Sequence, residues 1–78
     1  MDIEEKLKEI FSRVLDIKTS NITDNSSMEN TSEWDSFNHL LLINEIEKEF
    51  KIEIKASDMN NIRSFNDIKN AVENSLKK

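Results

Sequence analysis

Apolar residues recur at helical spacing in three segments of the chain. From Ile3 to Asp16 they stand at offsets 0, 4, 7, 8 and 11, which define one face of a helix. The second segment runs from Ser36 to about Lys51, and the third begins after Ser64. The residues expected to face the core are Ile3, Leu7, Ile10, Phe11 and Val14, then His39, Leu42, Ile43, Ile46 and Phe50, then Phe65, Ile68, Val72 and Leu76.

Each predicted helix begins at a capping residue. Asp2 is followed three residues later by Glu5, and Ser64 is followed at the same spacing by Asp67, as in a capping box. Asp35 is the expected N-cap of the middle helix. The last helix ends on two lysines, Lys77 and Lys78, whose charge suits the C-terminal end of a helix dipole.

The segments between these helices have less regular patterns. No periodicity is sustained from Lys18 to Asp35, and so long a loop in a small domain is expected to be functional or pinned to the core. Phe50 to Ile54 alternates like a strand without a partner strand, so we expect an extended connector. Ser57 to Ile62 is expected to form a short helix. The residues expected to anchor these segments in the core are Ile22, Met28 and Trp34, then Ile52 or Ile54, then Met59 and Ile62.

The predicted elements give an all-α fold: a small bundle of three longer helices and one short helix, in one domain over residues 1–78. The middle helix is apolar on two sides. Phe37, Leu41, Asn44 and Lys48 lie opposite its core face, flanked by Leu40. Because 78 residues can hardly bury a helix on all sides, we expect a partner to cover this outer face.

Composition excludes several classes of function. With 16 acidic and 11 basic residues the net charge is −5, so nucleic acid is not an expected partner. Proteins with basic docking surfaces are the partners that this charge favours. There is no cysteine for a disulfide or a thiolate. No apolar run approaches the ~20 residues of a membrane span, and the N-terminus does not resemble a signal peptide, so we expect a cytoplasmic protein. Nothing demands a dimer, so we expect a monomer.

Metal sites are not expected. Asp24 to Asp35 has the twelve-residue length of a calcium loop, but Met28 stands at position five and Glu29 at position six, where glycine is needed. A zinc site would lack its usual ligands, because the chain has one histidine and no cysteine. We expect neither ion.

The candidate functional residue is Ser36, within the sequence Trp34-Asp35-Ser36-Phe37. It stands where the polar loop gives way to the middle helix. A serine at a helix N-terminus is often only a cap. Its hydroxyl also lies beside unpaired N–H groups, which makes the position suitable for a group bearing a phosphate.

This Asp-Ser pair, opening a helix near the middle of a chain of this length, resembles the attachment motif of acyl carrier proteins. The resemblance extends to Phe50-Lys51-Ile52-Glu53-Ile54, which is similar to that family's "Phe-x-Ile-x-Ile" exit from the helix. It implies a carrier and not an enzyme. Ser36 would hold a 4′-phosphopantetheine arm from coenzyme A, and Asp35 would support its attachment. The arm's thiol would supply the sulfur that the chain lacks and would carry acyl or aminoacyl thioesters.

The resemblance also implies partners: a phosphopantetheinyl transferase, an acyl- or aminoacyl-loading ligase, and a downstream synthase or transferase. The surface expected to meet them is formed by Phe37, Leu40, Leu41 and Glu47. Three residues differ from the pattern of fatty-acid carriers: Trp34 before the motif, Leu41 where an acid is common, and Lys48 within the acidic run. These departures favour a carrier of a specialised pathway.

Two other interpretations remain open at this stage. The chain could be a helical adaptor that binds a protein through Phe37 and Leu41 without any arm. A hydrolase using Ser36 and His39 is less favoured, because no nucleophile elbow surrounds the serine. His39 is otherwise expected at the mouth of the core. Trp34 is expected to be a core residue that closes the loop, with a place in the exposed docking patch as the alternative.

Overall fold

The structure is a computed structural model that describes residues 3–59 and 61–77. In chain order, its elements are α1 (Ile3–Leu15), a 3₁₀ turn (Thr19–Asn21), α2 (Ser36–Phe50), α3 (Ala56–Met59) and α4 (Phe65–Leu76). The all-α fold, with three longer helices and a short one, is confirmed. Within the described ranges, the single β-type pairing is an isolated bridge between Ser27 and Ser64.

Helices α1 and α2 each end at a residue in the left-handed conformation. Asp16 has φ 57° and Lys51 has φ 56°, a role usually taken by glycine, which this chain lacks. A left-handed non-glycine residue costs roughly 1–2 kcal/mol, less for Asp because its side chain bonds locally. Both predicted ends are therefore correct to within one residue. The predicted cap at Asp2 and the charge of Lys78 lie outside the described residues.

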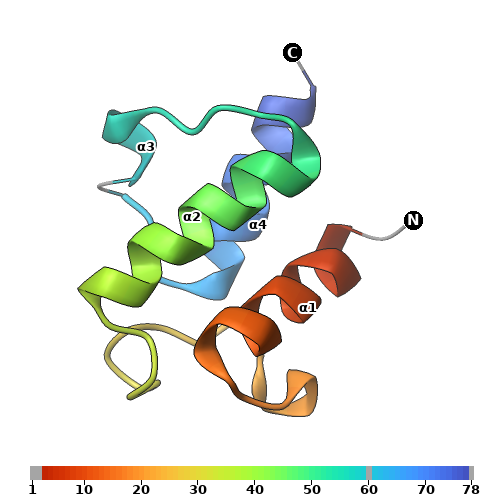
Figure 1. Cartoon of the computed structure of the whole chain (residues 1–78). Coiled ribbons are helices and arrows are strands. Elements are labelled where there is room, and N and C mark those ends of the chain that lie inside the picture. The colour runs from red at the N-terminus through yellow and green to blue at the C-terminus, as the bar shows by residue number, and fades with distance from the viewer. Residues whose placement is uncertain (1–2, 60, 78) are drawn as a thin grey trace.

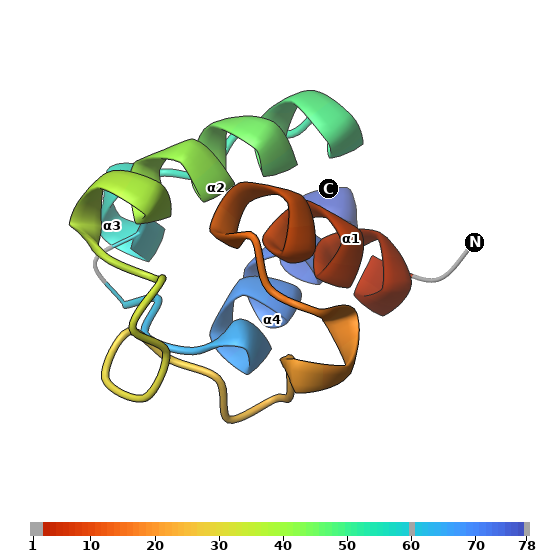
Figure 2. The same ribbon diagram turned by 60° about the horizontal axis from the view of Figure 1, so that its bottom comes forward.

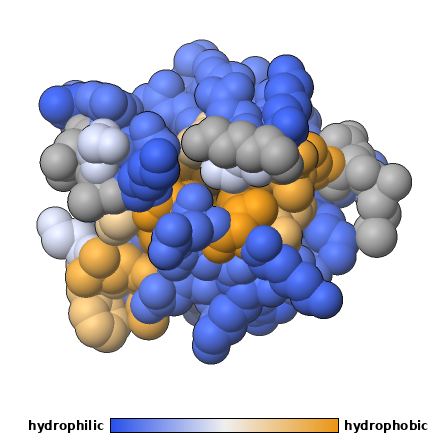
Figure 3. All heavy atoms as spheres, turned by 90° about the horizontal axis from the view of Figure 1, so that it is seen from above, coloured by the Kyte–Doolittle hydropathy of each residue, from blue (hydrophilic) through white to orange (hydrophobic). Residues whose placement is uncertain are grey.

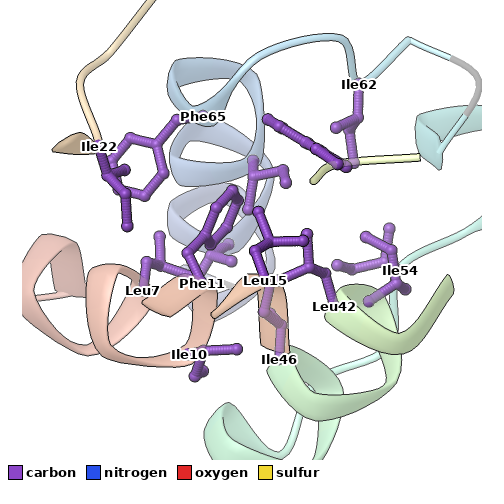
Figure 4. Packing of buried hydrophobic residues seen from close by; sticks show 14 residues of the cluster. Leu7, Ile10, Phe11, Leu15, Ile22, Leu42, Ile46, Ile54, Ile62 and Phe65 are labelled. Atoms are coloured by element: carbon purple, nitrogen blue, oxygen red, sulfur yellow. The ribbon is translucent and has the colours of Figure 1, made fainter. Parts of the chain in front are cut away.

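The core lies between the three longer helices. Figures 1 and 2 show α1, α2 and α4 around a common interior, with α3 on the side where α2 begins. Side chains from all three helices and from both long connections converge there (Figure 4). The predicted core faces of α1 and α2 are confirmed, with Ile3, Val14 and Phe50 only partly buried. The fully buried large side chains are Trp34, Phe11, Phe65, Leu7, Leu42, Ile46, Ile68 and Val72.

The long loop before α2 is pinned to the core at two of the three predicted points. Ile22 and Trp34 are 2% and 1% exposed. Met28 is 37% exposed, so its predicted burial is wrong; it lies at the rim of a surface cavity instead. Leu76 is also wrongly predicted to be buried, since it is 44% exposed in the last turn of α4.

The same loop also caps the beginning of α4. The Phe65 N–H donates to the Ser26 carbonyl at 2.8 Å, and the Asn66 N–H donates to the Asp24 carbonyl at 3.2 Å. Ser64 Oγ accepts from the Asp67 N–H at 3.2 Å, which confirms the predicted N-cap. Donors at the start of a helix have no intrahelical acceptor, so these bonds attach the loop firmly to α4.

The connection between α2 and α4 differs slightly from the prediction. Ile54 is buried and Ile52 is partly buried, as expected of an extended connector. Helix α3 is shorter than predicted and begins earlier, so Ile62 lies beyond its end although it is buried. A four-residue helix is barely longer than one turn, and its boundaries leave little trace in the sequence pattern.

Ion pairs connect segments that are distant in sequence. Lys69 on α4 binds Glu4 on α1 at 3.0 Å and Asp24 in the loop at 3.1 Å. The hydrogen bond from Lys69 holds the pKa of Glu4 below its usual value, and the bonds to Glu4 and Asp24 raise the pKa of Lys69. Lys6 likewise binds Glu49 on α2 at 2.7 Å and lowers the pKa of that carboxyl. These pairs lie at the surface, where such contacts contribute little.

Candidate functional site

Ser36 is the first residue of α2, and its side chain is exposed. Asp35 Oδ1 accepts from the Asn38 N–H at 2.8 Å, and the Asp35 carbonyl accepts from the His39 N–H at 2.8 Å. The Asn38 side-chain amide donates to the Glu33 carbonyl at 2.7 Å. Asp35 is therefore the predicted N-cap, and the start of the helix is fixed by bonds that leave the Ser36 hydroxyl free for chemistry.

The first turn of α2 is suited to an anion. Helices begin with N–H groups that have no acceptor within the helix. In the part of the chain that the structure describes, the N–H groups of Ser36 and Phe37 have no acceptor. A phosphate esterified to Ser36 Oγ would lie beside these donors. Near the positive end of the helix dipole an exposed anion is stabilised by about 0.3–1 kcal/mol.

Trp34 and His39 form a buried pair behind this exposed serine. The Trp34 indole N–H donates to His39 Nδ1 at 3.1 Å, and the two rings stack with centroids 6.0 Å apart. Trp34 also contacts Phe11 edge to face, with centroids 5.1 Å apart. The prediction that Trp34 is a core residue is confirmed, and its alternative place in an exposed docking patch is wrong. The pair holds the end of the loop against the helix that Ser36 opens.

The same bond sets the chemistry of His39. Nδ1 accepts from Trp34, so the ring is neutral and its proton lies on Nε2, as assigned from the hydrogen-bond pattern. Burial lowers the pKa of His39, which favours this neutral form. An Nε2–H cannot take a proton from Ser36, and among the described residues no hydrogen bond joins the two side chains. The Ser36–His39 hydrolase hypothesis therefore lacks its base.

His39 also lines a surface cavity of about 320 Å³. This volume is at the lower end of the range for small-molecule sites, roughly 300–1,000 Å³. Three of its residues come from the connection that contains α3. The lining residues are Met28, Glu29, His39, Met59, Ile62 and Arg63. Sequence reasoning placed His39 at the mouth of the core but gave no sign that Glu29 and Arg63 would join it, because they come from separate irregular segments.

An apolar surface follows Ser36 along the outside of α2. Phe37 is 69% exposed, Leu40 55% and Leu41 39%. Figure 3 shows an apolar cluster over the start of α2, at the lower left, within a mostly hydrophilic surface. Glu47, the fourth residue expected here, is only partly exposed, and its carboxylate accepts from the Ile54 N–H at 2.9 Å. The predicted outward face of α2 is therefore present, with Glu47 at its edge.

Among residues 3–59 and 61–77, no three His, Asp or Glu side chains gather where they could hold a metal ion. Over the same residues, none of the helices combines the length and the apolar character needed to cross a membrane.

Comparisons with known proteins identify the family of the chain. The family described as "phosphopantetheine attachment site" matches residues 5–72. The acyl carrier protein of Buchnera aphidicola subsp. Schizaphis graminum (strain Sg) is 40% identical over 57 residues, or 73% of this chain and 72% of that protein. The solved structure of holo acyl carrier protein from Geobacter metallireducens is similar with a TM-score of 0.88 and 26% identity, covering 99% of this chain and 88% of that one.

The chain thus falls in the class of helical carriers that hold a phosphopantetheine arm. It belongs to the acyl carrier protein family. Its prosthetic group is 4′-phosphopantetheine, which supplies a terminal thiol for thioesters, and the protein is a carrier and not an enzyme. A phosphopantetheinyl transferase and biosynthetic enzymes are the partners that this membership implies.

Proposed function

We propose that the protein is an acyl or aminoacyl carrier whose 4′-phosphopantetheine is attached to Ser36. The observation that carries the proposal is the exposed Ser36 hydroxyl, in an Asp-Ser pair, at the start of a helix whose first N–H groups have no acceptor among the described residues. In this proposal Ser36 Oγ attacks the pantetheine-bearing phosphorus of coenzyme A, the pyrophosphate bond breaks, and 3′,5′-ADP leaves, so that Oγ is held in a phosphodiester. The hydroxyl proton leaves to a base of the transferase, since His39 cannot accept it.

Asp35 has a positioning role in the proposal. Its carboxylate is bound to the Asn38 N–H, so it fixes the first turn of α2 in the orientation that a transferase meets. Phe37, Leu40 and Leu41, with Glu47 at the edge, form the surface that partner enzymes contact. Aromatic and large apolar side chains commonly dominate such interfaces.

The proposed pathway is a specialised one, in which a ligase loads an acyl or aminoacyl group and a synthase or transferase consumes it. Leu41 and Lys48 support this choice, because they make the outer face of α2 less acidic than the corresponding face of fatty-acid carriers. The protein is proposed to act as a monomer in the cytoplasm, where coenzyme A is available. A flexible arm then presents the thioester to successive enzymes at high effective concentration.

Intact-mass spectrometry tests the site. The native protein, incubated with coenzyme A and a broad-specificity phosphopantetheinyl transferase, is expected to gain the mass of one 4′-phosphopantetheine. Ser36→Ala should gain nothing, whereas the matched control Ser32→Ala, at an exposed serine of the same loop, should be modified like the native protein. Circular dichroism checks that each variant is folded. A gain in Ser36→Ala would place the arm elsewhere, and no gain in the folded native protein would overturn the proposal.

A further inference from the structure

His39 is a buried histidine with one ring nitrogen unpaired. The residue is 9% exposed, and its Nδ1 accepts from the Trp34 indole N–H at 3.1 Å. The proton of the neutral ring therefore lies on Nε2, which is a donor. Among the residues that the structure describes, no group accepts from this Nε2–H. The ring is thus held in place at one nitrogen and offers a donor at the other.

This donor is accessible from the surface cavity and is not sealed in the core. Within residues 3–59 and 61–77, every fully buried polar side-chain atom has a hydrogen-bond partner. Since Nε2 has no partner, it is not one of the fully buried atoms. The opening beside it is the cavity of about 320 Å³ that His39 lines together with Met28, Met59 and Ile62. Because these neighbours are apolar, an acceptor placed before Nε2–H is bound more strongly than in water.

The cavity residue His39 lies beside the proposed attachment point. It follows Ser36 by three residues on α2, and residues at this spacing are neighbours on the surface of a helix. A group esterified to Ser36 Oγ therefore begins next to the histidine. The 4′-phosphopantetheine arm contains amide carbonyls, and loading adds a thioester carbonyl. Carbonyl oxygens are acceptors, which is the chemistry that an N–H donor binds.

We propose that the His39 Nε2–H donates a hydrogen bond to a carbonyl oxygen of the attached arm, either an amide of the arm or its thioester, and so holds the arm in this cavity. The proposal rests on the attachment to Ser36 proposed above and adds a binding residue to it. Trp34 is a positioning residue, because its indole N–H fixes the tautomer that leaves the proton on Nε2. The bond that prevents His39 from acting as a base makes it a donor.

Two charged residues of the cavity are the competing candidates. Arg63 is also a donor, but it is exposed, so its guanidinium is hydrated before an arm binds and gains little from one more acceptor. Glu29 is exposed as well, and its carboxylate only accepts, so it can bind amide N–H groups but no carbonyl. His39 is favoured over both because its donor is fixed before the arm arrives.

NMR of ¹⁵N-labelled protein tests the donor directly, since the chain contains a single histidine. The native protein is compared at about pH 7.5 in its apo form, after loading from coenzyme A, and after loading from acetyl-coenzyme A. Mass spectrometry confirms each form. The apo form should carry its imidazole proton on Nε2. On loading, the Nε2–H signal should move downfield and exchange with water about two- to tenfold more slowly, the factor that a typical net hydrogen bond gives.

Labelled carbonyls identify the acceptor. One sample carries ¹³C in the amide carbonyls of the arm, and the other carries it in the acetyl carbonyl. A downfield shift of an arm carbonyl in the form with a free thiol assigns the acceptor to an amide. A shift of the acetyl carbonyl, with a change at Nε2–H only in the acetyl form, assigns it to the thioester. Either result supports the proposal.

The variant His39→Asn separates arm binding from core structure. Its amide oxygen can still accept from Trp34, but the side chain is too short to place a donor where Nε2 lies. The carbonyl shift should therefore disappear in His39→Asn. It should persist in the matched control Arg63→Gln, which removes the competing guanidinium. Circular dichroism checks the fold of both variants, and if His39→Asn does not fold, the Nε2–H signals of the native protein decide the question.

The outcomes separate this proposal from the carrier function. An Nε2–H signal that is the same in all three forms, a carbonyl shift that persists in folded His39→Asn, or one that is lost only in Arg63→Gln would overturn the donor role and leave the carrier function intact. A proton on Nδ1 in the apo form would also overturn it. No gain of mass on loading would instead overturn the carrier function on which the proposal rests.

Discussion

At the scale of single residues, the site depends on the contrast between Ser36 and its neighbours Trp34 and His39. Ser36 is exposed, whereas Trp34 is 1% and His39 9% exposed, and the indole N–H satisfies His39 Nδ1. A buried polar atom without a partner would cost about 1–3 kcal/mol, so this bond permits a histidine within an apolar environment. The Ser36 hydroxyl is therefore exposed to solvent, whereas the two side chains that pack behind it are buried.

The first prediction concerns pH and His39. Burial lowers the pKa of His39 below the value of about 6.5 that it has in an unfolded chain. Between the two values the unfolded state binds more protons, so the free energy of unfolding falls as pH drops below about 6.5. Urea unfolding between about pH 7.5 and about pH 5.5 should show this loss, and His39→Asn, whose amide can still accept from Trp34, should reduce it.

The carboxyl groups affect a lower pH range. Glu4 and Glu49 have lowered pKa values because of Lys69 and Lys6, so their contribution is lost only as pH falls below about 4.5. The pH range in which these carboxyl groups change the stability does not overlap with the range in which His39 does. The assignment to His39 would be contradicted if the free energy of unfolding had the same slope against pH, above about pH 5.5, in the native protein and in His39→Asn.

At the scale of elements, the start of α2 is set by Asp35. Its carboxylate accepts from the Asn38 N–H at 2.8 Å, in the extended backbone conformation typical of an N-cap. Asp35→Ala should reduce the free energy of unfolding by about 1 kcal/mol, measured by urea denaturation. Asp35→Asn keeps an acceptor at the same place and should cost a few tenths of a kcal/mol. A matched control is Glu33→Ala, which removes an exposed acid of the same loop; a loss equal to that of Asp35→Ala would argue against the cap.

Comparison of sequence and structure shows which elements the pattern could define. The three longer helices and their core faces were predictable because apolar side chains recur at helical spacing and Asp35 and Ser64 provide caps. Met28 and Leu76 were wrongly predicted to be buried. Apolar character gives a tendency toward burial, but whether a side chain in a loop or a last turn reaches the core depends on where the chain leads it.

The candidate site divides in the same way. The positions of Asp35 and Ser36 at the start of α2 could be predicted because a helix cap is defined by neighbouring residues. The bond between Trp34 and His39 and the cavity residues Glu29 and Arg63 could not be found. They result from the packing of irregular segments, which have no periodicity in the sequence.

At the scale of the whole molecule, aromatic contacts join the loop to helices at both ends of the chain. Phe11 on α1 lies edge to face with Trp34, at 5.1 Å, and with Phe65 on α4, at 5.0 Å. Such pairs contribute about 0.5–1.5 kcal/mol beyond the area they bury. Because the loop that presents Ser36 shares these contacts with the helices, we expect loop and helices to unfold together.

Phe65→Ala tests this coupling. A domain of 78 residues has a free energy of unfolding of about 4–12 kcal/mol, and truncation of a buried phenylalanine costs about 3–5 kcal/mol. Urea unfolding followed by Trp34 fluorescence and by circular dichroism should give coincident midpoints in the native protein, both lowered by the substitution. Should Phe65→Ala fail to fold, Phe65→Leu offers the same test with a smaller loss. Leu76→Ala, at an exposed leucine of the same helix, should shift both midpoints little. A fluorescence midpoint well below the helical one would mean that the loop opens independently, and Ser36 would then be presented by a mobile segment.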